Sequence, residues 1–176
     1  MKLPESTIYE FKEYLDLPYE VCGALHSNGI PYKYVIKGPK IAHSQRGTCI
    51  MPRSAHVWHT HPKQSKPVPS IEDVIRVISK NNRKTSVIVT TLGIYILTNK
   101  NYSKSKYYNS ENKLTTEIRK HITNYVTQEI NGILRSIKSH SSIKMSNNKK
   151  RIVINKSINS INTYLEKFIS IKLFEF

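Results

Sequence analysis

Apolar and polar positions divide the first hundred residues into alternating helices and strands. Their spacing predicts one helix, two strands around a turn, a further strand, a second helix and a β-hairpin. These elements cover residues 6–15, 19–25, 32–36, 56–59, 70–81, 85–91 and 93–98, and residues 48–51 are an additional strand candidate. Ser6 is positioned to cap the first helix. The order predicts an α/β fold, in which a mixed β-sheet is flanked by helices.

The remainder of the chain has a mainly helical pattern. Apolar residues recur at helical spacing from Leu114 to Ile137, residues 157–169 are amphipathic, and residues 171–176 have the composition of a strand. Residues 138–151 are polar and basic without periodicity, which is typical of a linker. We therefore expect a core at 1–99, a basic loop or insert at 100–112, and a helical basic C-terminal part at 113–176 that packs on the core.

The chain is strongly basic, with 28 Lys and Arg against 12 Asp and Glu among 176 residues, a net charge of +16. From Lys100 onward there are fifteen basic and five acidic residues. Such an excess favours a polyanion, such as nucleic acid, or an acidic protein surface as partner. The abundance of Ile, Asn, Lys, Ser and Tyr has a second explanation, because AT-rich coding sequence produces the same bias.

Two further features bear on the compartment. No apolar run reaches membrane-spanning length, and the acid-containing N-terminal stretch does not resemble a secretion signal. We expect an intracellular, cytoplasmic protein without a membrane partner, in a host cytoplasm or virion if its compositional bias reflects a viral origin. Cys22 and Cys49 are the only cysteines, and we expect them to be reduced and buried.

The strongest chemical signal lies at the end of the strand predicted at 56–59. Side chains alternate along a strand, so His59 and His61 project from the same face, and Pro62 ends the strand's hydrogen bonding. Ser70 opens the next helix, with Asp73 in its first turn. Two imidazoles and one carboxylate are a ligand set that catalytic zinc uses, with the fourth position left for water.

Each of these residues also has a simpler explanation. Ser70 and Asp73 form the sequence of a capping box, and the two histidines could be a hydrogen-bonded strand end. Glu20, an acid before an apolar strand, could simply face solvent. The combination of the five positions, rather than any one of them, favours a metal site.

Together these segments resemble the JAB/MPN metalloprotease family and its JAMM motif. The chain contains an upstream Glu20 in Glu-Val-Cys-Gly-Ala-Leu, then His-Thr-His-Pro at 59–62, then Pro-Ser-Ile-Glu-Asp at 69–73. The predicted order of helices and strands also resembles the core of that family, whose fold is related to cytidine deaminases. The segment between His61 and Ser70 is one residue longer than is usual for the motif.

The resemblance implies a Zn²⁺-dependent isopeptidase that acts on conjugates of ubiquitin or a ubiquitin-like protein. His59, His61 and Asp73 would be the zinc ligands, Glu20 the general base, and Ser70 a hydrogen-bond donor to the oxyanion. Hydrolysis of a small amide or a carrier-protein adduct is a further possibility. The alternative is a non-catalytic or bifunctional binding protein whose basic C-terminal half contacts nucleic acid or an acidic partner.

Overall fold

A computed structural model describes residues 1–38, 49–79, 83–100, 116–139 and 146–174. Its centre is a six-stranded sheet in the order β2-β1-β3-β4-β5-β6. The strands are β1 (Val21–Leu25), β2 (Pro31–Lys37), β3 (His56–Thr60), β4 (Thr85–Thr90), β5 (Gly93–Asn99) and β6 (Ile169–Phe174). β3 and β4 are parallel and every other neighbouring pair is antiparallel. The predicted α/β fold with a mixed sheet is therefore confirmed.

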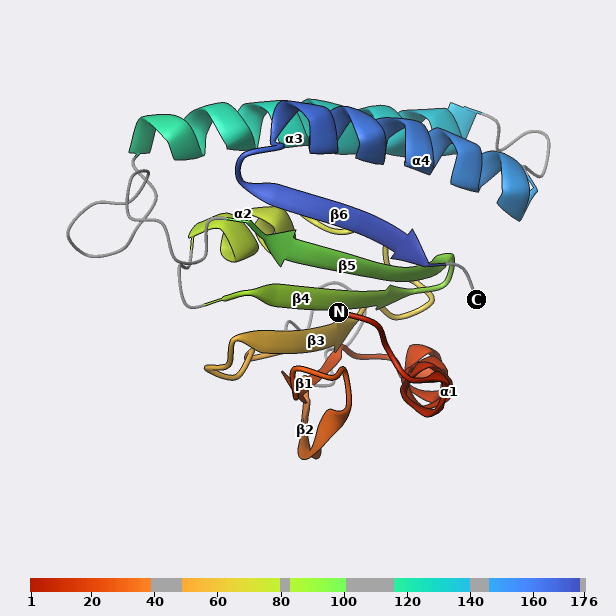
Figure 1. Ribbon diagram of the computed structural model, residues 1–176. Coiled ribbons are helices and arrows are strands. Elements are labelled where there is room, and N and C mark those ends of the chain that lie inside the picture. Colours follow the sequence, from red (N-terminus) through yellow and green to blue (C-terminus); the bar gives the residue numbers. More distant parts are fainter. Residues whose placement is uncertain (39–48, 80–82, 101–115, 140–145, 175–176) are drawn as a thin grey trace.

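Helices cover both faces of this sheet (Figure 1). α1 (Glu5–Glu13) and the short 3₁₀ helix η1 (Tyr14–Asp16) pack on one face, while α2 (Ile71–Ser79), α3 (Thr116–Ser139) and α4 (Asn147–Tyr164) pack on the other. Alternate residues of β4 separate the two cores, since Val87 and Val89 face α1 whereas Ile88 faces the other helices. α1 begins at Glu5 with Pro4 as its N-cap, so the predicted cap at Ser6 was wrong.

Trp58 is the centre of the core on the α1 side. It is fully buried, and its ring lies 4.5 Å from that of Phe11 and 5.5 Å from that of Tyr14, measured between centroids. Gly23 is directly opposite Trp58 in the β1–β3 pairing. A Cβ atom at Gly23 would lie 2.7 Å from Trp58 Nε1, so the glycine allows the indole to cover β1. Trp58 therefore points to the face opposite His59, as strand alternation predicts.

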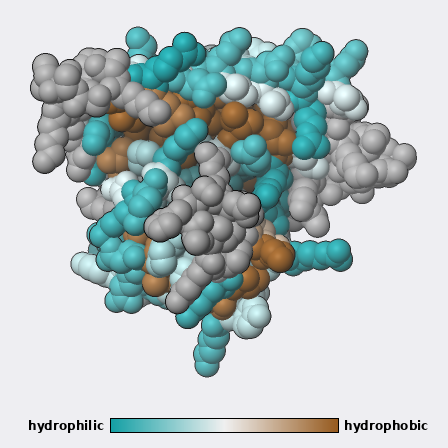
Figure 2. Space-filling view, turned by 180° about the vertical axis from the view of Figure 1, so that it is seen from behind, coloured by the Kyte–Doolittle hydropathy of each residue, from teal (hydrophilic) through white to brown (hydrophobic). Residues whose placement is uncertain are grey.

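The C-terminal segments belong to the same structure. β6 adds to β5 at the edge of the sheet, and buried residues of α3 and α4 share one core with α2. Seen from behind, hydrophobic surface is gathered in a band beneath the upper helices, whose outer surface is polar (Figure 2). α4 begins at Asn147, ten residues before the predicted helix start, so part of the predicted linker at 138–151 is helical. Residues 140–145 and most of the predicted insert at 100–112 lie outside the described residues.

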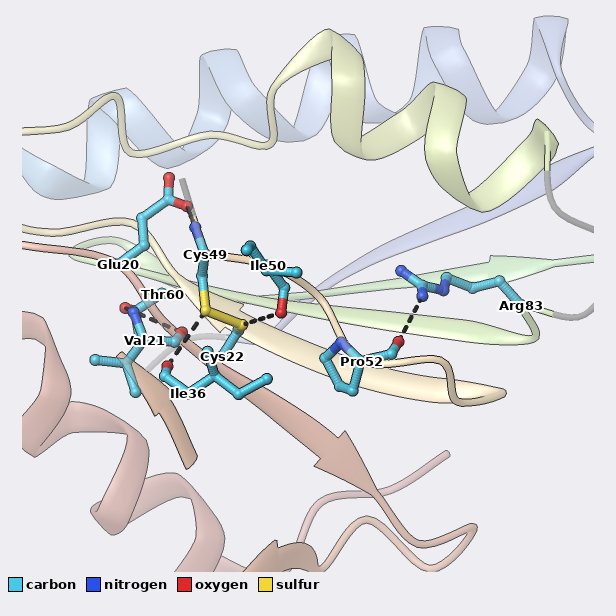
Figure 3. The surroundings of a disulfide bond; sticks show 9 residues. All are labelled: Glu20, Val21, Cys22, Ile36, Cys49, Ile50, Pro52, Thr60 and Arg83. Atoms are coloured by element: carbon cyan, nitrogen blue, oxygen red, sulfur yellow. Dashed lines mark hydrogen bonds between the residues drawn. A yellow bond between two sulfur atoms is a disulfide. The ribbon is translucent and has the colours of Figure 1, made fainter. Parts of the chain in front are cut away.

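The prediction that the two cysteines are reduced was wrong. A disulfide joins Cys22 of β1 to Cys49, although both residues are buried as expected (Figure 3). Residues 49–51 are not a strand, in contrast to the prediction for 48–51, of which residue 48 lies outside the described part. Among the described helices, none combines the length and apolar character needed to cross a bilayer.

Candidate metal centre

The carboxyl end of β3 places two imidazoles side by side. His61 follows the strand's last residue, but its N–H still donates to Val89 O at 2.8 Å, so the alternation of the strand continues through it. His59 and His61 therefore face the same way, and their Nε2 atoms are 3.2 Å apart. Only 5% and 8% of the two residues is exposed, so the pair is largely removed from water.

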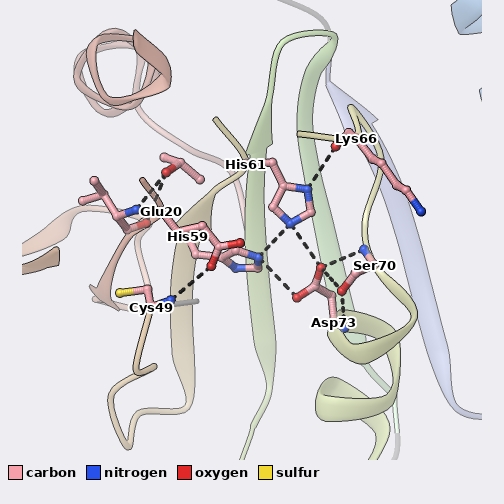
Figure 4. Close-up of polar contacts among 9 residues, drawn as sticks. Glu20, Cys49, His59, His61, Lys66, Ser70 and Asp73 are labelled. Carbon is pink, nitrogen blue, oxygen red and sulfur yellow. Dashed lines mark hydrogen bonds and ion pairs between the residues drawn. The ribbon is translucent and has the colours of Figure 1, made fainter. Parts of the chain in front are cut away.

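The first turn of α2 supplies a carboxylate to the same point. β3, α2 and the parallel strand β4 form a β-α-β unit, which brings the start of the helix beside the end of the strand. Asp73 Oδ1 lies 3.2 Å from His59 Nε2, and Asp73 Oδ2 lies 3.4 Å from His61 Nε2 (Figure 4). Asp73 is itself only 6% exposed. Side chains from two separate elements thus converge on one buried point.

One ligand atom from each of these three side chains lies within 4.8 Å of the others, close enough to share a metal ion. With bonds of about 2.0–2.1 Å, two donors on a tetrahedral zinc are roughly 3.3–3.4 Å apart. The two histidine Nε2 atoms, 3.2 Å apart, are close to that value. Each also lies near a different oxygen of Asp73, His59 at 3.2 Å from Oδ1 and His61 at 3.4 Å from Oδ2. The three residues are also the only group of His, Cys, Asp and Glu in the described chain that could jointly hold a metal ion. Two imidazoles and one carboxylate are ligand types that Zn²⁺ accepts.

The charges at the site favour an ionised carboxylate. Burial opposes ionisation of Asp73, but the two neighbouring imidazoles outweigh it and hold the Asp73 pKa well below its usual range. Burial also opposes charge on His61, yet the contact with Asp73 and the nearby Glu20 carboxylate raise the His61 pKa overall. The carboxylates of Asp73 and Glu20 therefore favour a positive charge at the histidines.

Hydrogen bonds outside the donor set fix its orientation. His61 Nδ1 lies 3.2 Å from Lys66 O, and donation to this carbonyl leaves the Nε2 atom of a neutral ring with a lone pair for a metal ion. Tyr95 OH donates to Pro67 O at 3.0 Å, which anchors the same loop to β5. The loop between His61 and Ser70, which is one residue longer than is usual for the motif, is thus held at Lys66 and Pro67. Asp73 contacts both histidines despite the longer loop.

Ser70 and Asp73 form the capping box as well as part of the site. Asp73 Oδ2 accepts from Ser70 N and Ser70 Oγ, both at 2.8 Å, and Ser70 Oγ accepts from Asp73 N at 3.1 Å. The same carboxylate faces the two histidines. The two interpretations of the sequence are therefore compatible, because the cap orients the proposed ligand.

Glu20 lies beside this group without a direct bond to it. The residue immediately before β1 is half-buried, and its Oε2 accepts from Cys49 N at 3.1 Å. Among the described residues, no hydrogen bond joins Glu20 to His59, His61 or Asp73, although its charge contributes to the raised His61 pKa. The structure thus brings four of the five predicted residues into direct contact and places the fifth next to them.

Sequence reasoning missed the groups that support Glu20. Thr60, between the two histidines, accepts a hydrogen bond from Val21 N at 2.9 Å and so connects β3 to the residue after Glu20. The Cys49 amide provides the side-chain contact. Main-chain donors leave no residue-type signal, and Thr60 resembles any other strand threonine, so neither contact was predictable from the sequence.

No protein-family model, curated protein or solved structure matches this chain. The geometry of the site is accordingly the observation on which a functional proposal rests.

Proposed function

We propose that this protein is a zinc-dependent amide hydrolase of the JAMM type, and that it cleaves isopeptide bonds of ubiquitin or ubiquitin-like conjugates. The observation that carries the proposal is the group of three buried ligand types, two imidazoles and one carboxylate, whose donor atoms lie within 4.8 Å of one another. His59, His61 and Asp73 would hold the ion, and one coordination position would remain for water and substrate. The substrate class rests on the resemblance of the motif segments to that family.

When bound, zinc lowers the pKa of a coordinated water towards about 7 and polarises the scissile carbonyl. The Glu20 carboxylate takes the proton from the attacking water and delivers it to the departing amine. Its bond to the Cys49 amide leaves the second carboxylate oxygen available for this transfer, because the amide engages Oε2. No residue of the chain needs to form a covalent bond with the substrate.

Ser70 would support the oxyanion that develops on the former carbonyl oxygen. Its hydroxyl now donates to Asp73 Oδ2, so donation to the oxyanion requires the hydroxyl to rotate. The Ser70 N–H keeps its own 2.8 Å bond to Asp73 during that rotation, and the cap of α2 therefore survives. The carboxylate can meanwhile direct lone pairs to the ion.

The basic C-terminal part supports a second, compatible function in binding a polyanion or an acidic partner. Exposed basic side chains on α3 and α4 include Arg119, Lys120, Arg135, Lys149 and Lys156. They lie on helices that also complete the core beneath the site. Such a surface can retain an acidic substrate or nucleic acid without any change at the metal centre.

A panel of isopeptide-linked ubiquitin and ubiquitin-like conjugates tests the proposal. The zinc-loaded wild-type chain should release free ubiquitin or ubiquitin-like protein from at least one conjugate. Glu20→Gln should retain zinc while losing at least about a hundredfold in kcat, since general acid–base catalysis contributes that much. The exposed Glu13→Gln on α1 is the matched control and should be fully active. Equal activity in Glu20→Gln and wild type would remove Glu20 from the mechanism.

A further inference from the structure

The disulfide joins the two segments that determine where the Glu20 side chain points. Cys22 lies in β1, two residues after Glu20, and is paired directly opposite His59. The backbone N–H of Cys49 donates to Glu20 Oε2 at 3.1 Å. One covalent bond therefore limits how far the Cys49 amide can move from β1 and from Glu20, the residue immediately before that strand (Figures 3 and 4).

The backbone around Glu20 is held independently of this bond. Gly38 N donates to Glu20 O at 2.7 Å, and the following residue, Val21, donates to Thr60 Oγ1. The Glu20 side chain differs, because within the described chain the Cys49 amide is its hydrogen-bond partner. Cys49 itself belongs to no helix or strand. The direction of the Glu20 carboxylate thus depends on the position of Cys49, and the disulfide to Cys22 holds Cys49 near the site.

We propose that the Cys22–Cys49 disulfide is a redox-sensitive clamp that positions Glu20. In the oxidised form the Cys49 amide holds the carboxylate beside the metal ligands. In the dithiol form the covalent limit is gone, and the carboxylate exchanges this amide for water. Glu20 has catalytic importance only under the proposed function, on which this part of the inference rests, whereas the coupling between the disulfide and the carboxylate does not require it.

The surroundings of the two sulfurs accommodate both redox forms. Cys22 Sγ lies 3.5 Å from Ile50 O, and Cys49 Sγ lies 3.2 Å from Ile36 O. In the disulfide neither sulfur has a proton, so these are contacts rather than hydrogen bonds. After reduction each thiol can donate a hydrogen bond to the neighbouring carbonyl oxygen. The dithiol form therefore does not bury two thiols without hydrogen-bond acceptors.

The reductant is a small thiol of the glutathione class. Its thiolate attacks the sulfur of Cys49, the more exposed residue at 5% against 0% for Cys22. The Cys22–Cys49 bond breaks, a mixed disulfide forms on Cys49, and Cys22 leaves as a thiolate that is then protonated. A second thiol attacks the reductant's sulfur and releases Cys49. The protein gains two electrons and two protons, and the two thiols become one disulfide.

Because coupling between two sites is reciprocal, the clamp can be tested without any assay of hydrolysis. The full-length wild-type chain is equilibrated with glutathione buffers of defined redox ratio, and the dithiol fraction is measured by alkylation and mass spectrometry. Glu20→Gln replaces a charge-assisted bond to the Cys49 amide with a neutral one. The dithiol fraction should therefore rise, with an equilibrium shift of about threefold or more towards the thiols. Glu13→Gln, exposed on α1, should match wild type. Identical equilibria in wild type and Glu20→Gln would overturn the clamp.

Kinetics test its consequence for the proposed reaction. The reduced wild-type chain, and separately the Cys22→Ser/Cys49→Ser variant, should lose at least about tenfold in kcat with KM and zinc content unchanged, since positioning groups act mainly on the transition state. Reduced wild-type protein serves as the second form in case the double variant does not fold. Loss of zinc, or a rise in KM in place of the fall in kcat, would show general disruption of the site and overturn the positioning role. Absence of hydrolysis in both redox forms would contradict the proposed function, and the glutathione equilibrium would still decide the clamp.

Discussion

The Ser70 hydroxyl and the Asp73 carboxylate are hydrogen bonded at 2.8 Å, and this contact belongs both to the cap of α2 and to the candidate metal centre. Asp73 is the residue that connects α2 to His59 and His61. A carboxylate in the first turn of a helix is stabilised by the free N–H groups there. The side chain that caps the start of α2 is therefore also the proposed charged ligand.

Replacing Ser70 with Ala should affect stability and metal binding together. Loss of the cap costs about 1 kcal/mol of unfolding free energy, and loss of a hydrogen bond to a metal ligand weakens zinc binding by roughly 10–100-fold. Urea unfolding and a competitive zinc chelator measure the two effects.

Ser146→Ala is the matched control, because Ser146 caps α4 and accepts from Lys149 N far from the donor set. It should lose comparable stability with unchanged zinc affinity. If both variants bind zinc equally tightly, Ser70 does not orient Asp73.

Gly23→Ala should destabilise the protein through a steric conflict with Trp58. The added Cβ would lie 2.7 Å from Trp58 Nε1, and overpacking of this kind costs about 1–3 kcal/mol. Gly132→Ala on α3 is the opposite case, since a Cβ atom there would meet no other atom within 4 Å, and it should stabilise by roughly 0.5–1 kcal/mol. Urea midpoints that shift in the same direction for both variants would contradict the close approach of β1 and Trp58.

The whole described chain should unfold as one unit, because α4 and β6 complete the core shared with α2. Leu165 is 1% exposed in this core, and Leu165→Ala should cost about 2–5 kcal/mol. Trp58, the only tryptophan, reports on the opposite side of the sheet, while the circular dichroism of α3 and α4 reports on the helices. Both signals should shift together in urea.

The control for this experiment is Ile152→Ala, because Ile152 is 63% exposed on α4 and its truncation should change stability by no more than about 0.5 kcal/mol. Separate transitions for Trp58 fluorescence and helical signal in Leu165→Ala would show that the C-terminal part folds independently.

Local patterns predicted much of the sheet and the donor set. Alternation placed His59 and His61 on one face, and the capping sequence placed Asp73 in the first turn of a helix; both relationships depend on residues close together in the chain.

Contacts between distant segments were not predictable in the same way. The pairing of Cys22 with Cys49 crosses 27 positions and depends on how the segment after β2 returns to β1. The early start of α4 was missed for another reason: Asn147 to Lys150 contain no apolar residue, so the first turn has no periodicity to detect. Its cap, Ser146, was the one local signal available.

Zinc stoichiometry of the purified chain tests the central claim most directly. Protein prepared without chelators is analysed by elemental mass spectrometry, for wild type, for Asp73→Ala and for the neighbouring exposed acid in Glu72→Gln. We expect about one zinc per chain in wild type and Glu72→Gln, and little or none in folded Asp73→Ala, as three protein ligands require. A folded wild-type chain that neither retains zinc nor takes it up on titration would contradict the metal centre and the function proposed from it.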